Sequence, residues 1–327
     1  MGLGGLGGLG RTGVGIVCGI VAGALWGVVF LAPELVREFT PLQLSAGRYL
    51  AYGLFAAVLV APRWRTLAAT LGRGEWWALV WLSLLGNILY YVLLASAVQL
   101  GGMAMTSLVI GFLPVAVTLV GSRDRDAVPL RALIPSLVLS AAGILCIGWQ
   151  TLGAAGTGSA TVQATGLVCA VGALVSWTTY AVGNSRWLGR LDHVSAHEWS
   201  LLTGVVTGAQ ALLLAVPAFL IGAADHGAPE WLRFCAIAGG VAILASIVGN
   251  AFWNRMSRLL PLTLTGQMIL FETLFALLYG FLWEQRMPSM AEVAAIGFVI
   301  ASVLSCVTAH QPKNAVPVES AVGEAQV

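Results

Sequence analysis

Charged residues are scarce in this chain: only 9% of its 327 residues are Asp, Glu, Lys or Arg, whereas 58% are hydrophobic. A soluble protein of ordinary composition carries roughly 25% charged residues. No soluble core needs so much apolar surface at this length, so the composition predicts a polytopic membrane protein that sits in a lipid bilayer. The net charge is only +2 and no basic stripe is present, so nucleic acid is not an expected partner.

The sequence also lacks the motifs of the common enzyme classes. It contains no HExxH motif, no Ser–His–Asp constellation within an apolar segment and no phosphate-binding loop followed by lysine. Its five cysteines stand singly in apolar stretches without a CxxC pair, which favours packing over a disulfide or a metal site. We therefore expect no enzyme activity, no metal and no cofactor.

Long apolar runs are what the sequence does contain. Ten of them reach the roughly 20 residues that a helix needs to cross a bilayer. The runs are continuously apolar and too long for the alternating strands of a membrane β-barrel, and helices satisfy their own backbone groups in lipid. We predict an all-α integral membrane protein with a flexible tail at 1–11, a disordered tail at 310–327 and ten transmembrane helices at about 12–33, 41–61, 75–99, 103–121, 130–150, 163–185, 196–221, 231–253, 262–283 and 290–309.

The positive charges indicate which way the helices cross the membrane. If the N-terminus lies in the cytoplasm, twelve Lys and Arg residues fall on the inner side and three, Arg37, Arg233 and Arg286, fall on the outer side. Because cytoplasmic loops carry an excess of Lys and Arg, this count predicts that both termini are cytoplasmic. The opposite orientation would reverse the ratio.

A short motif occurs twice in the chain. Residues 83–90 read SLLGNILY and residues 246–253, which follow by 163 positions, read SIVGNAFW. The copies lie on the third and eighth predicted spans, and a shift of five spans reverses the direction of crossing. Trp26 on the first span and Trp177 on the sixth correspond in the same way. These features predict two inverted five-helix repeats, residues 12–150 and 163–309, an arrangement typical of transporters.

The polar and aromatic residues of the repeats are candidates for a substrate cavity. Helical spacing places Ser83, Asn87 and Tyr90 on one face, with Tyr91 beside them. Asparagine offers a donor and an acceptor without a charge, and aromatic rings stack on flat apolar groups or cations. The serines and glycines of the motif are better explained by close helix packing. The predicted cavity-lining residues are Trp26, Asn87, Tyr90, Tyr91, Phe112, Trp177, Tyr180, Asn250 and Gln267.

Two ionisable residues lie within predicted spans. Glu272 is near the centre of the ninth span, where a charge is costly and a functional role is the default hypothesis. It could carry a coupling proton, meet a cationic group of a substrate or form a buried structural pair with Arg48. Arg48 lies two turns into the second span and could bind a carboxylate, pair structurally or snorkel outward.

Several features together resemble a known family. Ten helices in a five-plus-five repeat, Trp26 followed by Gly27, Pro114 late in the fourth span, and Trp283-Glu284 in place of a recurring Gly-Glu pair are similar to the EamA-type branch of the drug/metabolite transporter superfamily. Among its members the chain most resembles bacterial aromatic amino acid exporters of the YddG type. That resemblance implies an inner-membrane, alternating-access exporter of Phe, Tyr and Trp, and of other amino acids. An exporter of cationic drugs or of another small metabolite is the alternative, and the oligomeric state stays open.

Overall fold

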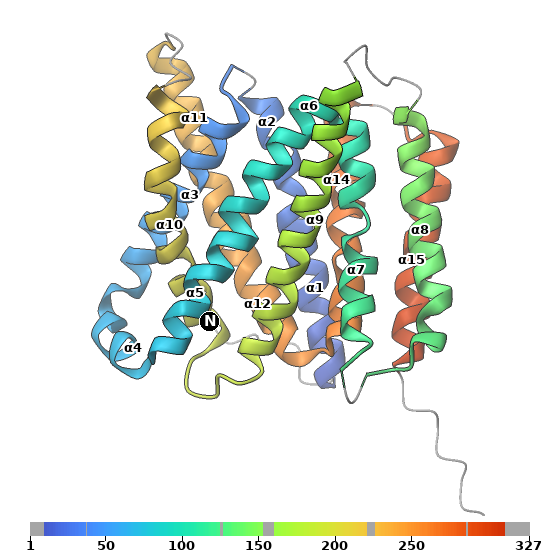
Figure 1. Cartoon of the computed structure of the whole chain (residues 1–327), viewed down its shortest axis with the longest axis horizontal. Coiled ribbons are helices and arrows are strands. Elements are labelled where there is room, and N and C mark those ends of the chain that lie inside the picture. The colour runs from blue at the N-terminus through green and yellow to red at the C-terminus, as the bar shows by residue number, and fades with distance from the viewer. Residues whose placement is uncertain are drawn as a thin grey trace, which may run out of the picture.

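The computed structural model describes residues 10–36, 38–124, 127–152, 160–220, 226–285 and 287–310. Within these ranges the protein is all-helical and contains no strand. Most helices lie side by side along one direction (Figure 1). Seven of the described helical segments are long and apolar enough to cross a bilayer: Leu42–Thr70, Arg73–Leu94, Thr161–Leu188, Ala196–Leu220, Ala228–Leu259, Leu262–Trp283 and Met290–Ala309. The all-helical membrane class predicted from composition is therefore confirmed.

Breaks within the helical segments divide the N-terminal half into many elements. Its helices are α1 (Arg11–Gly27), η1 (Val28–Phe30), α2 (Ala32–Leu35), α3 (Pro41–Val60), η2 (Ala61–Arg63), α4 (Trp64–Thr70), α5 (Arg73–Ser83), η3 (Leu84–Leu89), α6 (Tyr90–Ile110), α7 (Leu113–Gly121) and α8 (Leu130–Leu152). The C-terminal half contains α9 (Ala160–Leu188), α10 (Ala196–Leu220), α11 (Ala228–Val241), η4 (Ala242–Gly249), α12 (Asn250–Leu259), α13 (Leu262–Met268), α14 (Leu270–Glu284) and α15 (Met290–Ala309).

The structure differs from the predicted spans at the loop between the third and the fourth. The third and fourth spans were separated near residues 100–102, but α6 is helical without a break from Tyr90 to Ile110. The interruption falls at Gly111 and Phe112 instead, and α7 restarts with Pro114 in its first turn. Proline is tolerated there because its missing N–H would have no helical partner at that position.

Reciprocal caps explain where three of the helices begin. Thr40 accepts a hydrogen bond from the Gln43 backbone N–H at the start of α3, and the Gln43 side chain accepts one from the Thr40 backbone. Ser289 with Glu292 forms the same capping box before α15, and Ser195 pairs with Glu198 before α10. The carboxylates in these first turns thus satisfy exposed backbone donors and complement the helix dipole.

Helices of the two halves interleave rather than forming separate bundles. Extensive contacts join α6 to α9, α3 to α10, α8 to α15, α1 to α14 and α7 to α13. In Figure 1, α8 and α15 stand together at one end of the molecule, while α3, α10 and α11 stand at the other. Residues near the middle of the long helices therefore meet residues from the opposite half of the chain. Most of the two predicted tails, together with Arg37, Arg125, Arg286 and Lys313, lies outside the described residues.

Candidate functional site

An aromatic cluster lies where α1, α6, α9 and α12 meet. The rings of Trp26, Trp177 and Trp253 contact one another, with centroids 5.1 to 6.2 Å apart. Tyr90 and Tyr180 extend the cluster at 6.5 Å and 5.8 Å from Trp177. Trp177 therefore contacts four other rings and is the centre of the group. The sequence placed Trp26, Tyr90, Trp177 and Tyr180 in one site, and the structure does bring them together.

The two copies of the sequence motif coincide with two distortions of the helices. Both η3 and η4 are π-helical, and both contain or adjoin the glycine of the motif. A Cβ added at Gly86 would lie 2.4 Å from the Tyr180 ring, and one added at Gly249 would lie 2.9 Å from Nε1 of Trp26. The glycines are therefore needed for the close approach of an aromatic ring, in agreement with the packing role expected for them. π-Helical turns are frequent at functional sites.

The serine and asparagine of each copy make matching contacts across the molecule. Ser83 donates to the Thr203 carbonyl at 3.2 Å and Asn87 donates to the Thr207 hydroxyl at 2.9 Å. In the second copy, Ser246 accepts from Arg48 Nε at 3.1 Å and Asn250 donates to the Tyr52 hydroxyl at 3.5 Å. Thr203 follows Arg48, and Thr207 follows Tyr52, by the same 155 positions. The four contacts thus join equivalent positions: both asparagines donate to a hydroxyl, whereas Ser83 donates and Ser246 accepts.

These contacts differ from the arrangement predicted for Ser83, Asn87 and Tyr90 on the third span. Ser83 and Asn87 both reach α10, whereas Tyr90 contacts Trp177 of α9. A π-turn adds a residue to the helical turn, so the i, i+4, i+7 spacing of a regular α-helix does not hold across η3. The prediction that Ser83, Asn87 and Tyr90 share one face was therefore wrong in its geometry.

Arg48 is held inside the bundle rather than turned outward. Besides its bond to Ser246, the guanidinium lies over the rings of Tyr49 and Tyr91, at 5.2 and 5.9 Å from their centroids. Such cation–π contacts stabilise the positive charge between the helices. Arg48 and Glu272 are within electrostatic range of each other, and no ion pair joins these two described residues. The structural pair weighed from the sequence is thus not formed.

Gln267 and Phe112 lie in different surroundings from the aromatic cluster. Gln267 is completely buried on α13, donates to the Thr118 hydroxyl at 3.2 Å and accepts from Ser140 and Ser302 at 3.3 and 3.0 Å. All of these contacts are with α7, α8 and α15, so its amide joins helices in this conformation. Phe112 is partly exposed in the break between α6 and α7.

A second polar network closes the end of the molecule where α9 ends and α10 begins. The Arg258 guanidinium donates to the carbonyls of Leu188, Leu191 and Val194 in the α9–α10 connection, at 3.2 and 2.7 Å for the first two. Beside it, the buried Asn184 donates to Asn254 at 2.8 Å and accepts from the Trp199 indole at 2.9 Å. Sequence reasoning missed this network because polar residues near span ends look like ordinary loop-facing side chains.

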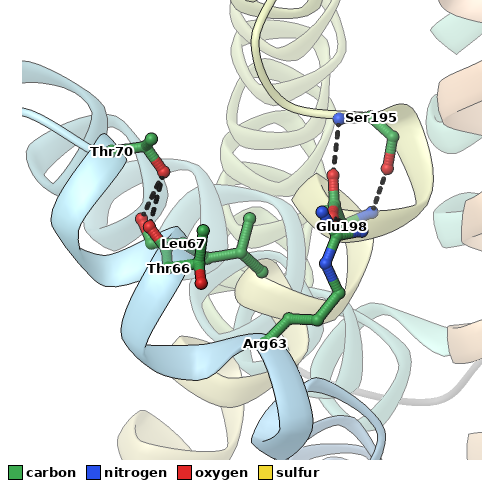
Figure 2. A network of polar contacts seen from close by, with 6 residues as sticks. All are labelled: Arg63, Thr66, Leu67, Thr70, Ser195 and Glu198. Atoms are coloured by element: carbon green, nitrogen blue, oxygen red, sulfur yellow. Dashed lines mark hydrogen bonds and ion pairs between the residues drawn. The ribbon is translucent and has the colours of Figure 1, made fainter.

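Figure 2 shows how the same end is joined to α4. Arg63, at the end of η2, forms an ion pair with Glu198, whose other oxygen accepts from the Ser195 backbone at 2.9 Å. Thr70 bonds back to the carbonyls of Thr66 and Leu67, which fastens the last turn of α4. At the opposite end of the bundle, Arg233 pairs with Glu38. There a backbone N–H and then the Arg233 guanidinium lower the pKa of the Glu38 carboxyl.

The fold and these contacts define a multi-pass helical membrane protein with polar and aromatic side chains gathered inside it. Within the described ranges, no group of three or more His, Cys, Asp or Glu side chains is placed to hold a metal. The chain belongs to the EamA-like transporter family, whose sequence profile matches residues 13–149. It is 31% identical over 329 residues to the inner membrane protein YtfF of Escherichia coli (strain K12), an alignment that covers 95% of this chain and 99% of that protein.

A solved crystal structure shares the fold. It superposes with a TM-score of 0.66 at 22% identity and covers 90% of this chain and 98% of its own. The protein is thus an EamA-type inner-membrane transporter, as the sequence resemblance implied, and membership of a transporter family favours transport over enzyme activity. The relative's name indicates no substrate, and nothing in these comparisons favours the YddG type or aromatic amino acids.

Proposed function

We propose that this transporter exports amino acids, with aromatic ones among them, by alternating access. The observation that carries the proposal is that two opposite charges, Arg48 and Glu272, both belong to helices of the bundle and that no ion pair joins these two described residues, while Arg48 lies over the rings of Tyr49 and Tyr91. A carboxylate and an ammonium on one carbon atom would satisfy both groups. The neighbouring Trp and Tyr rings would then stack on an aromatic side chain.

Partial exposure supports an interior opening at this place. Arg48, Asn87, Tyr90, Asn250 and Glu272 are all partly exposed, although each belongs to a membrane-spanning helical segment. Charged side chains rarely face lipid, because the hydrocarbon cannot solvate them. The exposed parts of Arg48 and Glu272 are therefore better explained by a water-filled space within the bundle, which is where the substrate would bind.

The repeat shows that the positive charge of Arg48 has no counterpart in the second half of the chain. Thr203 occupies the position equivalent to Arg48. Its backbone carbonyl accepts from Ser83 of the first motif, whereas the Arg48 side chain donates to Ser246 of the second. The first copy is thus joined to its partner helix without a charged side chain at that position. We infer that the exchange of threonine for arginine serves recognition of a substrate carboxylate, since it adds a costly charge where packing does not require one.

Matching contacts also support ten membrane crossings in two inverted repeats, residues 12–150 and 163–309. Helices α3 and α10 would be equivalent, and Gly53 meets Gly208 at their crossing. Helices α8 and α15 would be equivalent too, and Ser140 meets Ser302 at 2.7 Å. Equivalent residues touch each other only near a twofold axis. With the charge bias of the loops, this arrangement supports the proposal that both termini are cytoplasmic.

The end of the molecule where α9 ends and α10 begins would then lie on the cytoplasmic side. The Arg258 and Asn184 networks close it, so the described conformation is closed inward and the substrate would leave outward. Inward opening would require α12 to separate from the α9–α10 connection. The π-turns η3 and η4 lie midway along their helical segments and are the places where such a movement would bend them.

Counterflow in proteoliposomes tests the proposal. Proteoliposomes that contain the purified protein are loaded with unlabelled amino acid. Uptake of labelled Phe, Tyr, Trp, Ala and a cationic dye is then compared with and without a pH gradient. We expect uptake of aromatic amino acids, and we expect Trp177→Ala and Tyr90→Ala to reduce it more than uptake of Ala. If these variants lost transport of every substrate equally, the proposed contact between these rings and an aromatic substrate would be contradicted.

Efflux of cationic compounds is the second candidate function, and the position of Glu272 favours it. Glu272 lies within electrostatic range of Tyr90, and a carboxylate beside an aromatic ring also suits a flat cation. Glu272→Gln separates the two: it should abolish transport of a cation, whereas an amino acid could still bind through Arg48. Arg48→Gln should have the reverse effect. Full amino acid transport by Arg48→Gln would exclude the carboxylate role.

A further inference from the structure

An apolar groove of about 490 Å³ opens between α14 and α15, away from the aromatic cluster. Leu274, Leu278 and Leu282 of α14, Ile296 and Ile300 of α15, and Met287 of the connection contribute to its walls. Every residue that lines it is apolar. A separate, smaller cavity of about 250 Å³ shares Leu282 and is also lined by Leu31, Tyr279 and Trp283.

The groove has the depth of one membrane leaflet. From Leu274 to Leu282 the helix rises by about 12 Å, at about 1.5 Å per residue. Half of a bilayer core is about 15 Å thick. The groove begins at the α14–α15 connection, which lies at the opposite end of the bundle from the start of α1 and the end of α15 (Figure 1). It therefore extends from one membrane surface to about the midplane.

The groove is continuous with the surface that faces lipid. Leu282 is 67% exposed, and Leu304 and Val293 on the outside of α15 are 60% and 48% exposed. The main packing partners of α14 and α15 are α1 and α8, so these two helices leave a space between them. In a bilayer the material at such an opening is hydrocarbon, and leaving the space empty would forfeit dispersion contacts on both walls.

We propose that the groove binds one acyl chain of a phospholipid from the leaflet on the α14–α15 connection side. The absence of polar groups among the lining residues excludes a headgroup or an ionic substrate from the groove itself. The headgroup would sit above Met287 and Pro288, and the chain would end near Leu274 and Ile300. The lipid would act as a packing element that joins α14 to α15, independently of what the transporter carries.

Photo-crosslinking in phosphatidylethanolamine and phosphatidylglycerol vesicles tests this proposal. The vesicles contain a phospholipid with a diazirine either near the headgroup or near the chain end, and labelled residues are located by mass spectrometry. We expect the first probe to label Met287 and the second to label Leu274 and Ile300. Labelling should exceed that of Leu213 and Leu232 about fivefold, although these leucines on α10 and α11 are 78% and 73% exposed.

Two matched variants show whether the groove is responsible. Ile300→Trp fills the groove and should reduce its labelling to the level of Leu213, whereas Leu232→Trp, on an open surface, should leave it unchanged. Leu278→Phe is a milder filling variant in case Ile300→Trp does not elute as a folded protein. Labelling of the groove no stronger than that of Leu213 and Leu232 in the wild-type protein would overturn the proposal.

Two other occupants of the groove, a second copy of the chain or part of a substrate, would give different labelling results. If a second copy of the chain covered the groove, Ile300→Cys would be joined to its neighbour by a short bismaleimide in a Cys235→Ser background, and the lipid probe would not label the groove. If the apolar part of a substrate occupied it, added substrate would compete with the diazirine lipid. Either result contradicts an acyl chain as occupant, and neither depends on which solute is transported.

Discussion

Gly53 of α3 and Gly208 of α10 meet backbone to backbone. A Cβ added at Gly53 would lie 2.4 Å from the Cα of Gly208, and one added at Gly208 would lie 2.5 Å from the Cα of Gly53. No side chain can move aside to relieve such a contact, because the obstructing atoms belong to the main chain. Small residues that allow helices to approach are the usual means of packing within membranes.

Gly208→Ala should therefore destabilise the protein. The added methyl group forces α3 and α10 apart, and overpacking of this kind costs about 1–3 kcal/mol. Thermal unfolding in detergent, followed by tryptophan fluorescence, should show a lower midpoint. Gly239→Ala on α11 is the matched control, because no atom lies within 4 Å of a Cβ added there. Equal midpoints for the two variants would refute the close crossing.

Asn184→Leu should loosen the closed end of the molecule. The substitution removes the bonds to Asn254 and Trp199 and leaves two buried polar groups without their partner, at a cost of about 1–3 kcal/mol each. Cys18, 3% exposed on α1, then serves as a reporter. In a Cys235→Ser background we expect faster alkylation of Cys18 by a permeant maleimide.

Cys306 provides the control for that experiment, since it is completely buried between other helices. An unchanged rate at Cys306 together with a faster rate at Cys18 indicates local opening. Faster alkylation of both would indicate general unfolding, and an unchanged rate at Cys18 would show that the Asn184 network does not hold this end closed.

The sequence predicted the fold class because composition and apolar length alone determine it. Continuous apolar runs must be helices in lipid, because a helix satisfies its own backbone groups there. The loop predicted near residues 100–102 was wrong because an apolar helix continues through that stretch. The helix ends at Ile110, four residues before Pro114, which has no N–H to donate to the Ile110 carbonyl.

The sequence singled out four residues of the aromatic cluster, Trp26, Tyr90, Trp177 and Tyr180, but neither Trp253 nor the geometry of the helices that carry them. Aromatic residues such as Trp177 stand out in an apolar helix whatever its shape. The π-turns could not be foreseen, because they depend on Tyr180 and Trp26 packing against glycines that lie far away in the sequence. For the same reason, the buried position of Gln267 depends on Ser140 and Ser302, which only the fold brings to it.

The ion pair between Glu38 and Arg233 should make stability depend on pH. A hydrogen bond from the backbone and the Arg233 guanidinium lower the pKa of Glu38, so the folded protein binds this proton less readily than the unfolded chain. The stabilisation is present above the ordinary pKa of a glutamate and is lost as the pH falls through the lowered value. Unfolding midpoints of wild type and Arg233→Gln should thus differ at pH 7 and converge below pH 4. A constant difference at all pH values would contradict this assignment.

Gln267→Leu distinguishes a packing role from a substrate contact. Leucine fills a similar volume but leaves the hydroxyls of Thr118, Ser140 and Ser302 without the amide, which should lower stability by about 1–3 kcal/mol. Because the amide is fully buried and bonded to other helices, we expect transport of every substrate to fall by the same factor once it is corrected for folded protein. Ser140→Ala should behave alike. A selective loss of one substrate in Gln267→Leu but not in Ser140→Ala would instead place the amide in the substrate site, which requires a conformation in which α13 separates from α8 and α15.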